Sequence, residues 1–318
     1  MVGDCVGASV KRLSAIDIGT NTILMLIADV DPIGEIHVVR DEHAIARLGK
    51  GVDGQGKIFP DTFDRVLRYL FEYKKIHEAE HSQRIVACGT SALRDAANRD
   101  EFVRFIKERL GFEISILSGD EEARLTYLGG ISEFVASEPE RRYAVLDIGG
   151  GSTELTYGQG TAVHSESSVD VGSVRLTERR LKKSPPDPSV LNDTRQYVAE
   201  HLRQLPKLSS DARCIGVAGT LTTLAALDLD LTTYDRNRVS GHVMTLGTVE
   251  GIFDRLKVKS LEELWRIPQI LPERADILLA GILILTEVMK TTGIKEITVS
   301  DRGLRYGILM QAARERDN

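Results

Sequence analysis

The sequence predicts an α/β protein of two duplicated domains, each built on a mixed sheet, with a cleft between the domains. Asp17-Ile18-Gly19 recurs as Asp147-Ile148-Gly149, and Gly89-Thr90 recurs as Gly219-Thr220, in both cases 130 residues later. Two matches at one offset indicate an internal duplication. In each half, short apolar runs and amphipathic segments alternate in the order β-β-β-α-β-α. The expected domains cover 1–138 and 139–302.

The elements of the first half are predicted from apolar runs bounded by turn residues and from apolar residues at helical spacing. The expected strands cover 12–18, 22–30, 35–46, 84–88 and 112–117. Helices are expected after Pro60, over 99–110 and over 118–135, where Ser118 is a favourable N-cap. A glycine-containing turn at 17–22 joins the first two strands.

The second half repeats this pattern. The expected strands cover 143–148, 154–157, 161–168, 214–218 and 296–300. Helices are expected near 172–181, over 188–205, around Leu261 and over 275–291, whereas three prolines in 182–188 require a loop. The second glycine turn occupies 147–154. A terminal helix over 303–318 is expected to pack back on the first domain.

The composition is that of a folded protein, with 42% of the 318 residues hydrophobic and 28% charged. The net charge of −6 argues against a nucleic-acid binder. An anionic substrate would therefore need positively charged side chains close to its binding site.

Three widely spaced cysteines suggest no disulfide framework and favour a reducing compartment. The first ten residues contain no signal-peptide core, and the apolar stretch 277–288 is too short to span a membrane. We expect a cytoplasmic protein that binds neither nucleic acid nor membrane, and an apolar face on the 275–291 helix would support a homodimer.

Each glycine turn follows an apolar strand and leads into another. Glycine allows φ > 0 and brings backbone N–H groups close to a ligand, and neighbouring hydroxyls add donors. Hairpins use the same residues, but two copies in equivalent positions favour a phosphate site. The candidate phosphate-binding residues are Gly19, Thr20, Asn21 and Thr22 in the first turn and Gly149, Gly150, Gly151, Ser152 and Thr153 in the second.

An aspartate ends the strand before each turn. Asp17 and Asp147 cannot bind phosphate directly, but their oxygens suit Mg²⁺ or its water ligands, with Mn²⁺ as a possible substitute. The histidines form no zinc-binding pattern, since His77 and His81 are spaced i, i+4 without a third ligand suggested nearby. The sequence therefore predicts a magnesium site at the turns.

Both turns also carry a family resemblance. DIGTNT and DIGGGSTE resemble the phosphate-binding motifs of the actin–hexokinase–Hsp70 superfamily, which implies two actin-like, ribonuclease H-like domains. Within it, the chain resembles the exopolyphosphatase and guanosine pentaphosphate phosphohydrolase (Ppx/GppA) family from about Ala15 to Leu309. The narrower match rests on GTSALR at 89–94, SGDEEARL at 118–125, DIGGGSTE at 147–154, GSVRLTE at 172–178, Gly219-Thr220 and SDRGLR at 300–305.

The resemblance implies roles for several side chains. Glu122 matches the family position proposed as the base that activates the attacking water, and Glu154 matches a second carboxylate that would hold Mg²⁺ or orient water. Arg94 matches a substrate arginine that would meet phosphate oxygens as a fork. Arg302 and Arg305 are weaker candidates, since each could equally form a structural ion pair. Further phosphate contacts are implied for Thr90, Ser91, Arg175, Gly219 and Thr220.

The leading functional hypothesis is an exopolyphosphatase that releases terminal orthophosphate from inorganic polyphosphate, with Mg²⁺ assistance and a water activated by Glu122. The alternative within the family is a guanosine pentaphosphate 5′-phosphohydrolase, and the sequence leaves the choice of substrate open because no purine-pocket motif is readable. Two functions of other classes are alternatives: an ATP-dependent small-molecule kinase on the same fold, and a non-catalytic binder of polyphosphate or guanosine tetra- or pentaphosphate. A carboxylate at Glu122, placed for water, argues against both.

Overall fold

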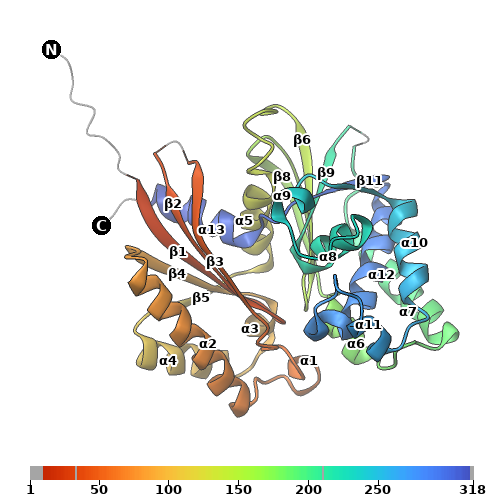
Figure 1. Cartoon of the computed structure of the whole chain (residues 1–318), viewed down its shortest axis with the longest axis horizontal. Helices are drawn as coiled ribbons and strands as arrows, with labels where there is room; N and C mark the ends of the chain where they lie inside the picture. The colour runs from red at the N-terminus through yellow and green to blue at the C-terminus, as the bar shows by residue number, and fades with distance from the viewer. Residues whose placement is uncertain (1–9, 33, 210, 316–318) are drawn as a thin grey trace.

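The computed structural model describes residues 10–32, 34–209 and 211–315, which form two mixed sheets with helices on their faces (Figure 1). The first sheet has the order β3-β2-β1-β4-β5, with the first three strands antiparallel and the last two parallel to β1. Its strands are β1 (Lys11–Ile18), β2 (Ile23–Val30), β3 (Ile36–Ala44), β4 (Arg84–Gly89) and β5 (Ile114–Ile116).

Alternate side chains of the first sheet face opposite ways, and each face has its own core. Ile16 and Ile18 of β1 pack under α2 (Pro60–Ala79) and α4 (Arg99–Leu110). Leu13 and Ala15 face the terminal helix α13 (Leu304–Arg314) instead. Two short helices, α1 (Val52–Gln55) and α3 (Ser91–Asp95), lie at the end of this domain nearest the glycine turns.

The second sheet repeats the plan of the first. Its order is β10-β11-β9-β6-β7-β8, in which β6, β7 and β8 are antiparallel and β9 and β11 run parallel to β6. The strand β10 is added antiparallel at the edge. The strands are β6 (Arg142–Ile148), β7 (Thr153–Gln159), β8 (Ala162–Val169), β9 (Arg213–Val217), β10 (Val243–Thr245) and β11 (Glu296–Val299).

Helices cover both faces of the second sheet as well. The larger core lies between one face and helices that include the long buried α12. The helices on this side of the domain and around its edges are α6 (Ser173–Arg179), α7 (Pro188–His201), α8 (Ala218–Asp228), α9 (Arg236–Val239), α10 (Leu246–Leu256), α11 (Leu261–Trp265) and α12 (Ala275–Thr292), with the 3₁₀ turns η1 (Leu202–Gln204) and η2 (Pro272–Arg274).

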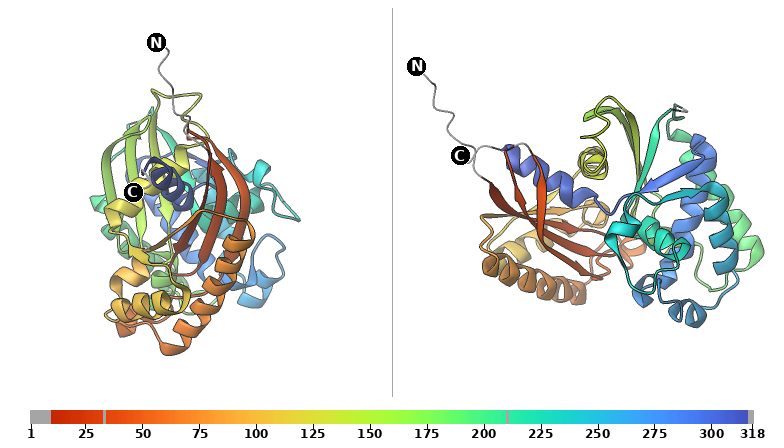
Figure 2. Two further views of the ribbon diagram at one scale, coloured as in Figure 1. Left: turned by 90° about the vertical axis from the view of Figure 1, so that its left-hand side faces the viewer. Right: turned by 45° about the horizontal axis from the view of Figure 1, so that its top comes forward.

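Two helices lie side by side between the sheets (Figures 1 and 2). The helix α5 (Gly119–Ile131) follows the first sheet in the chain but packs Tyr127 and Ile131 against β6 and β9 of the second. The helix α13 follows the second sheet and packs against β1 and β2 of the first. Each half of the chain therefore covers the sheet of the other half.

The predicted strands and the helices that begin near Pro60, Arg99 and Ser118 are all present, with bounds shifted by a few residues. The helix expected over 118–135 is shorter, because turns replace it after Ile131. The helix expected over 303–318 spans Leu304–Arg314, and 316–318 lie outside the described residues. The elements α8, α10 and β10 were not expected. The domain bounds 1–138 and 139–302 stay a prediction, and residues 1–9 lie outside the described part.

Among the described residues, none of the helices is both long and apolar enough to cross a membrane. The most apolar one, α12, is instead covered on nearly all sides by the core of the second domain.

The crossing of α5 and α13 depends on two glycines. A Cβ at Gly129 would lie 2.0 Å from the carbonyl oxygen of Gly303, and one at Gly307 would lie 1.9 Å from that of Leu125. Such distances are far below van der Waals contact, and the obstacle in both cases is backbone. The two helices therefore need glycine in order to approach this closely.

We expect Gly307→Ala to lower the free energy of unfolding by about 1–3 kcal/mol or more, because the helices must move apart. Denaturant unfolding monitored by circular dichroism measures the change. Gly251→Ala in α10 is the matched control: no atom lies within 4 Å of the added methyl group, and stability should rise by about 0.5–1 kcal/mol. Equal effects of the two substitutions would contradict this account of the crossing.

Candidate active site

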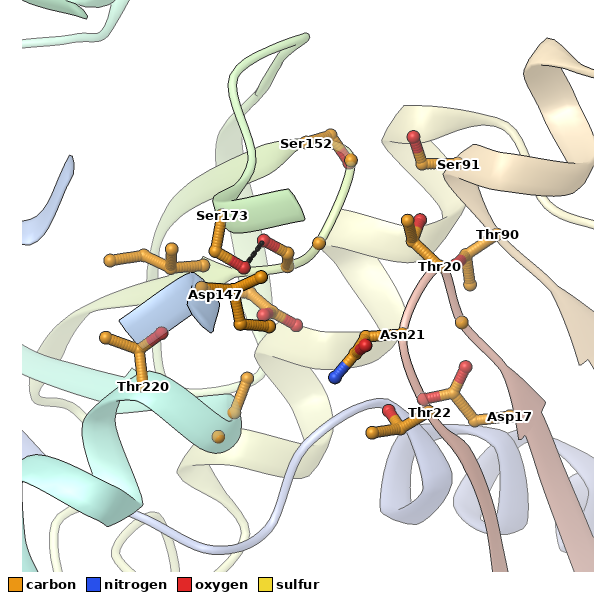
Figure 3. Close-up of a pocket in the computed structure, with 18 of the residues that line it drawn as sticks. Asp17, Thr20, Asn21, Thr22, Thr90, Ser91, Asp147, Ser152, Ser173 and Thr220 are labelled. Carbon is orange, nitrogen blue, oxygen red and sulfur yellow. Dashed lines mark hydrogen bonds between the residues drawn. The ribbon is translucent and has the colours of Figure 1, made fainter. Parts of the chain in front are cut away.

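The two glycine turns have the same hydrogen-bonded form. In the first, the Gly19 N–H donates to the carbonyl oxygen of Thr22 at 2.9 Å; in the second, the Gly149 N–H donates to that of Ser152 at 3.0 Å. Each turn joins the first two strands of its sheet, β1 to β2 and β6 to β7. Figure 3 shows them on opposite sides of one pocket, with Asn21 reaching from the first turn toward the side that carries Asp147.

None of the turn glycines has the left-handed backbone that the sequence suggested, and Gly150 and Gly151 are required for close packing instead. Gly19, Gly149, Gly150 and Gly151 are absent from the positive-φ glycines of the described residues. A Cβ at Gly151 would instead lie 2.3 Å from Oγ of Ser91, and one at Gly150 would lie 2.9 Å from Cβ of Thr20. The second turn therefore packs directly against the first domain.

A cavity of about 130 Å³ lies where the turns meet. Both domains contribute walls, and most of the predicted site residues are among them. These are Asp17, Gly19, Thr20, Asn21, Thr22, Thr90, Ser91 and Glu122 from the first half and Asp147, Gly149, Gly150, Gly151, Ser152, Gly219 and Thr220 from the second. We call this space the phosphate cleft.

The phosphate cleft also receives the N-terminus of α8. Ala218, the first residue of this helix, has φ = 70°, an unusual value for a residue with a side chain. This conformation brings Gly219 and Thr220 to the cleft wall. Free N–H groups at a helix N-terminus favour anions, which gives the cleft a further donor set besides the turns.

Arg94 lies beside the cleft and is paired with Glu122. Its Nη1 donates to Oε2 of Glu122 at 2.6 Å and to the carbonyl oxygen of Leu117 at 3.0 Å. Burial raises the pKa of Glu122, and the adjacent guanidinium opposes that rise. Oε1 of Glu122 accepts no hydrogen bond from the residues that the structure describes. Arg94 therefore holds the carboxylate by one oxygen, and it does not line the phosphate cleft.

Thr153 and Glu154 lie behind the second turn rather than in the cleft wall. The Thr153 hydroxyl donates to the carbonyl oxygen of Val171 at 2.6 Å, a bond that fixes the strand after the turn. Glu154 is buried opposite Asp147 in the β6–β7 pair, and its Oε1 accepts from Ser168 Oγ at 2.8 Å. Its other oxygen, Oε2, has no partner among the described residues.

Three of the arginines named from the sequence are occupied by carboxylates elsewhere. Arg175 pairs with Asp53 and Asp95 and lies outside the phosphate cleft. Arg302 pairs with Glu133, and Arg305 pairs with Asp41. Sequence spacing cannot show such pairings, because every one of these partners is distant along the chain.

Three carboxyl groups around the cleft have pKa values raised by burial and by the charges of neighbouring carboxylates, Glu122 above all. Burial, reinforced by the charge of Glu122, raises the pKa of Asp17 to about 7. Burial and the charges of Glu122 and Asp17 raise that of Asp147 to about 8. Burial, Glu122 and Asp147 raise the pKa of Glu154 well above its usual value, while serine hydroxyls lower it.

This donor set fits a divalent cation. Asp17 Oδ1 and Glu154 Oε2 are buried oxygens without a hydrogen-bond partner, and hard oxygen ligands suit Mg²⁺ or Mn²⁺. Within the described ranges, the only three-residue group whose ligand atoms all lie within 4.8 Å of one another is Asp31, Glu35 and His37, largely exposed at the β2–β3 turn. The cleft carboxylates therefore do not converge on one point, which suits an ion that keeps several waters.

Arg274 is a cleft residue that the sequence reasoning missed. Its guanidinium lies where a side chain at residue 219 would be, since a Cβ on Gly219 would overlap its Nη1. Nη2 donates to Nε2 of His43 at 2.7 Å, and burial lowers the pKa of His43 to about 4, so this imidazole is neutral. Arg274 forms no ion pair with a carboxylate in the part of the chain that the structure describes, and its Nε has no partner.

A local conflict in the sequence could have revealed Arg274. It is the N-cap of the long apolar helix α12, where the helix dipole disfavours a cation. An arginine at that position implies a distant partner or an anionic ligand.

A second cavity, of about 470 Å³, continues from the phosphate cleft. The two spaces share Asp17, Asp147, Gly219 and Arg274 among their lining residues. Beyond the shared residues, the larger cavity is lined by Leu231, Tyr234, Pro268 and Leu271 and also by Asp41, His43, Asp301 and Arg305.

Two domains of related plan, with glycine turns of the same form on opposite sides of one cleft and carboxylates around it, have the architecture of a phosphate-handling enzyme with an actin-like fold. Residues 26–316 match the model of the Ppx/GppA phosphatase family. Exopolyphosphatase 2 of Mycobacterium tuberculosis is 34% identical over 96% of this chain and 99% of that protein. This chain therefore belongs to the Ppx/GppA phosphatase family.

Solved structures agree. The Aquifex aeolicus member of the Ppx/GppA family is 32% identical, with a TM-score of 0.81 over 96% of this chain and 98% of that one. An exopolyphosphatase from Cytophaga hutchinsonii is 26% identical, with a TM-score of 0.85 over 95% of this chain and 98% of that one. The predicted fold, family and enzyme class, a phosphohydrolase, are confirmed.

In metal-free protein we expect the melting temperature to fall as the pH rises from about 5 to about 8. The unfolded aspartates have released their protons by about pH 5, whereas folded Asp17 and Asp147 retain theirs to about pH 7 and 8. The folded state binds more protons in this window, so its stability decreases as the pH rises. Calorimetry in the presence of a chelator measures the slope. Asp147→Asn should flatten it, and an unaltered slope in that variant would contradict the assignment.

Proposed function

We propose that this protein is an exopolyphosphatase that releases terminal orthophosphate from inorganic polyphosphate. The observation that carries the proposal is the position of Glu122, a buried carboxylate held by Arg94 at the wall of the cleft where the two phosphate-binding turns meet. The similarity to Exopolyphosphatase 2 of M. tuberculosis supports polyphosphate as the substrate.

The terminal phosphoryl group would bind between the turns. Backbone N–H groups of both turns and of the α8 N-terminus, together with the hydroxyls of Thr20, Ser152 and Thr220, offer neutral donors. Arg274 adds the cleft's unpaired positive charge. Donors fixed by the fold before the substrate arrives stabilise the charge that develops on the phosphoryl oxygens, which is the main source of rate in phosphoryl transfer.

Glu122 would act as the general base. Its carboxylate takes a proton from a water molecule, the water oxygen bonds to the terminal phosphorus, and the bond from phosphorus to the bridging oxygen breaks. The products are orthophosphate and a chain shortened by one phosphate, and Glu122 then releases its proton to solvent. A pKa raised by burial moves this base toward the operating pH, which favours proton transfer.

Asp17, Asp147 and Glu154 would hold Mg²⁺, or Mn²⁺ in its place, directly or through water. Bound there, the ion supplies positive charge to the phosphate oxygens. Without it, burial raises the pKa of all three side chains and favours their protonated, neutral forms, so the ion would have to displace protons when it binds.

We expect Glu122→Gln to lower kcat by roughly 10²–10⁴, because the amide cannot accept the proton. KM should change little or fall, since a negative charge near the substrate is removed. Steady-state phosphate release from polyphosphate measures both constants.

Glu121→Gln is the matched control. Glu121 forms a capping box with Ser118 at the surface end of α5, and glutamine can preserve that arrangement. Near-normal turnover in the Glu122 variant, or a dead Glu121 variant, would defeat the assignment. A kinase or a non-catalytic binder would show no phosphate release to begin with.

We expect Arg274→Ala to raise KM about tenfold or more, with a smaller loss in kcat, because the cation meets phosphate in the ground state as well. Arg266→Ala, an exposed arginine that follows α11, serves as the control. An unchanged KM for the Arg274 variant would remove this residue from the substrate site.

Guanosine pentaphosphate is the second candidate substrate. The 470 Å³ cavity that adjoins the phosphate cleft has the size of a small-molecule site, and Tyr234 and Leu271 offer apolar surface for a base. Parallel assays of phosphate release from polyphosphate and from guanosine pentaphosphate decide between the two. A kcat/KM for the nucleotide well above that for polyphosphate would overturn our first choice.

A further inference from the structure

Arg175 bridges the two domains next to the phosphate cleft. It lies on α6, which directly follows the second sheet's outer strand, and its side chain is 11% exposed. Nε donates to the carbonyl oxygen of Gly151 at 2.8 Å, within the second turn. Nη1 donates to Asp53 and Nη2 to Asp95, each at 2.5 Å, and both aspartates belong to the first half of the chain.

We propose that Arg175 is a positioning residue that fixes the second phosphate-binding turn against the first domain, in place of the phosphate ligand expected from the sequence. The inference rests on the proposed phosphohydrolase function. All three guanidinium nitrogens already have partners, and two of these are carboxylates. Binding phosphate would require the arginine to leave both, and it does not line the cleft.

The partners of Arg175 connect it both to the second glycine turn and to the helix that carries Arg94. Asp95 ends α3, the helix that also contains Ser91 and Arg94. Ser91 packs against Gly151, and Arg94 holds Glu122. The turn, the arginine and the base are thus joined through one short helix. A shift of the turn relative to α3 would move the phosphate donors relative to Glu122.

Neighbouring residues strengthen the same junction. Arg179, one turn further along α6, donates to both oxygens of Asp53 at 2.5 and 2.6 Å. Glu178 accepts the N–H of Gly51 at 3.1 Å. The short helix α1 is therefore bonded to α6 at three points, which places Asp53 where Arg175 can reach it.

The two hypotheses for Arg175, phosphate ligand or positioning residue, predict different changes in the kinetic constants of Asp95→Asn. If Arg175 bound phosphate, removing a competing carboxylate would free its guanidinium and lower KM. If Arg175 positions the turn, the same change weakens the bridge, and kcat should fall on the order of 10- to 100-fold because the donors no longer match the transition state. Asp95 is 35% exposed, so its substitution disturbs no core.

Kinetics of single and double variants separate these outcomes. We expect Asp95→Asn and Arg175→Gln each to lower kcat, and the double variant to lose little more than Arg175→Gln alone, because both act on one interaction. Arg175→Lys should recover part of the loss. A lower KM in Asp95→Asn, or additive losses in the double variant, would overturn the proposal.

Hydrogen exchange provides a readout that does not depend on activity. In the absence of substrate, peptides covering 149–152 should exchange faster in Asp95→Asn and Arg175→Gln than in wild type. Arg180→Ala is the control, because Arg180 lies over the Tyr197 ring within the second domain and should leave these peptides unchanged. Unaltered exchange in both bridge variants would refute the positioning role. Should wild type release no phosphate from polyphosphate or guanosine pentaphosphate, the proposed function fails while the exchange data still decide the role of Arg175.

Discussion

The direct contact between the two glycine turns is the constraint on which the rest of the site depends. The space that a side chain at Gly151 would need is filled by Ser91, and the space beside Gly150 is filled by Thr20. With a side chain at either position, the domains would stand further apart and the donors of the two turns would no longer line one cavity. The ion pairs of Arg175 stabilise this contact beside the turns, and the packing of α5 against α13 joins the two domains between the sheets.

The electrostatics of the cleft are unusual for a site that would bind a polyanion. Arg94 is neutralised by Glu122 and Arg175 by two aspartates, while burial raises the pKa of Asp17, Asp147 and Glu154 and favours their neutral forms in the absence of metal. Backbone donors, the N-terminus of α8 and Arg274 supply the positive potential of the cleft. Under the proposed function, phosphate affinity is expected to depend on metal, because the ion held by these carboxylates would add positive charge to the cleft.

The two domains share one plan of strands and turns, but they contribute different side chains to the site. In the first sheet Asp17 lies opposite Leu24, whereas in the second Asp147 lies opposite Glu154. The extra carboxylate is thus found in one domain only, and Glu122, the proposed base, comes from a helix that packs on the sheet of the other half. The two turns are therefore equivalent in form, whereas the carboxylates proposed for catalysis are distributed unequally between the domains.

The sequence by itself determined the repeat, the two turns, most strands and the family, because these depend on short motifs, on alternation and on a constant offset of 130 residues. It did not identify α8, whose apolar residues show no helical period, and it also missed α10, although the apolar residues of α10 recur at helical spacing. It misjudged why the turn glycines are needed. Tertiary structure alone decided which arginines are free. Arg175 is engaged by Asp53 and Asp95 and Arg94 by Glu122, while Arg274 reaches the cleft from a helix end that looks unfavourable for a cation. A guanidinium's role depends on the charges that the fold brings within a few ångströms of it, and partners more than twenty residues away leave no mark on local sequence.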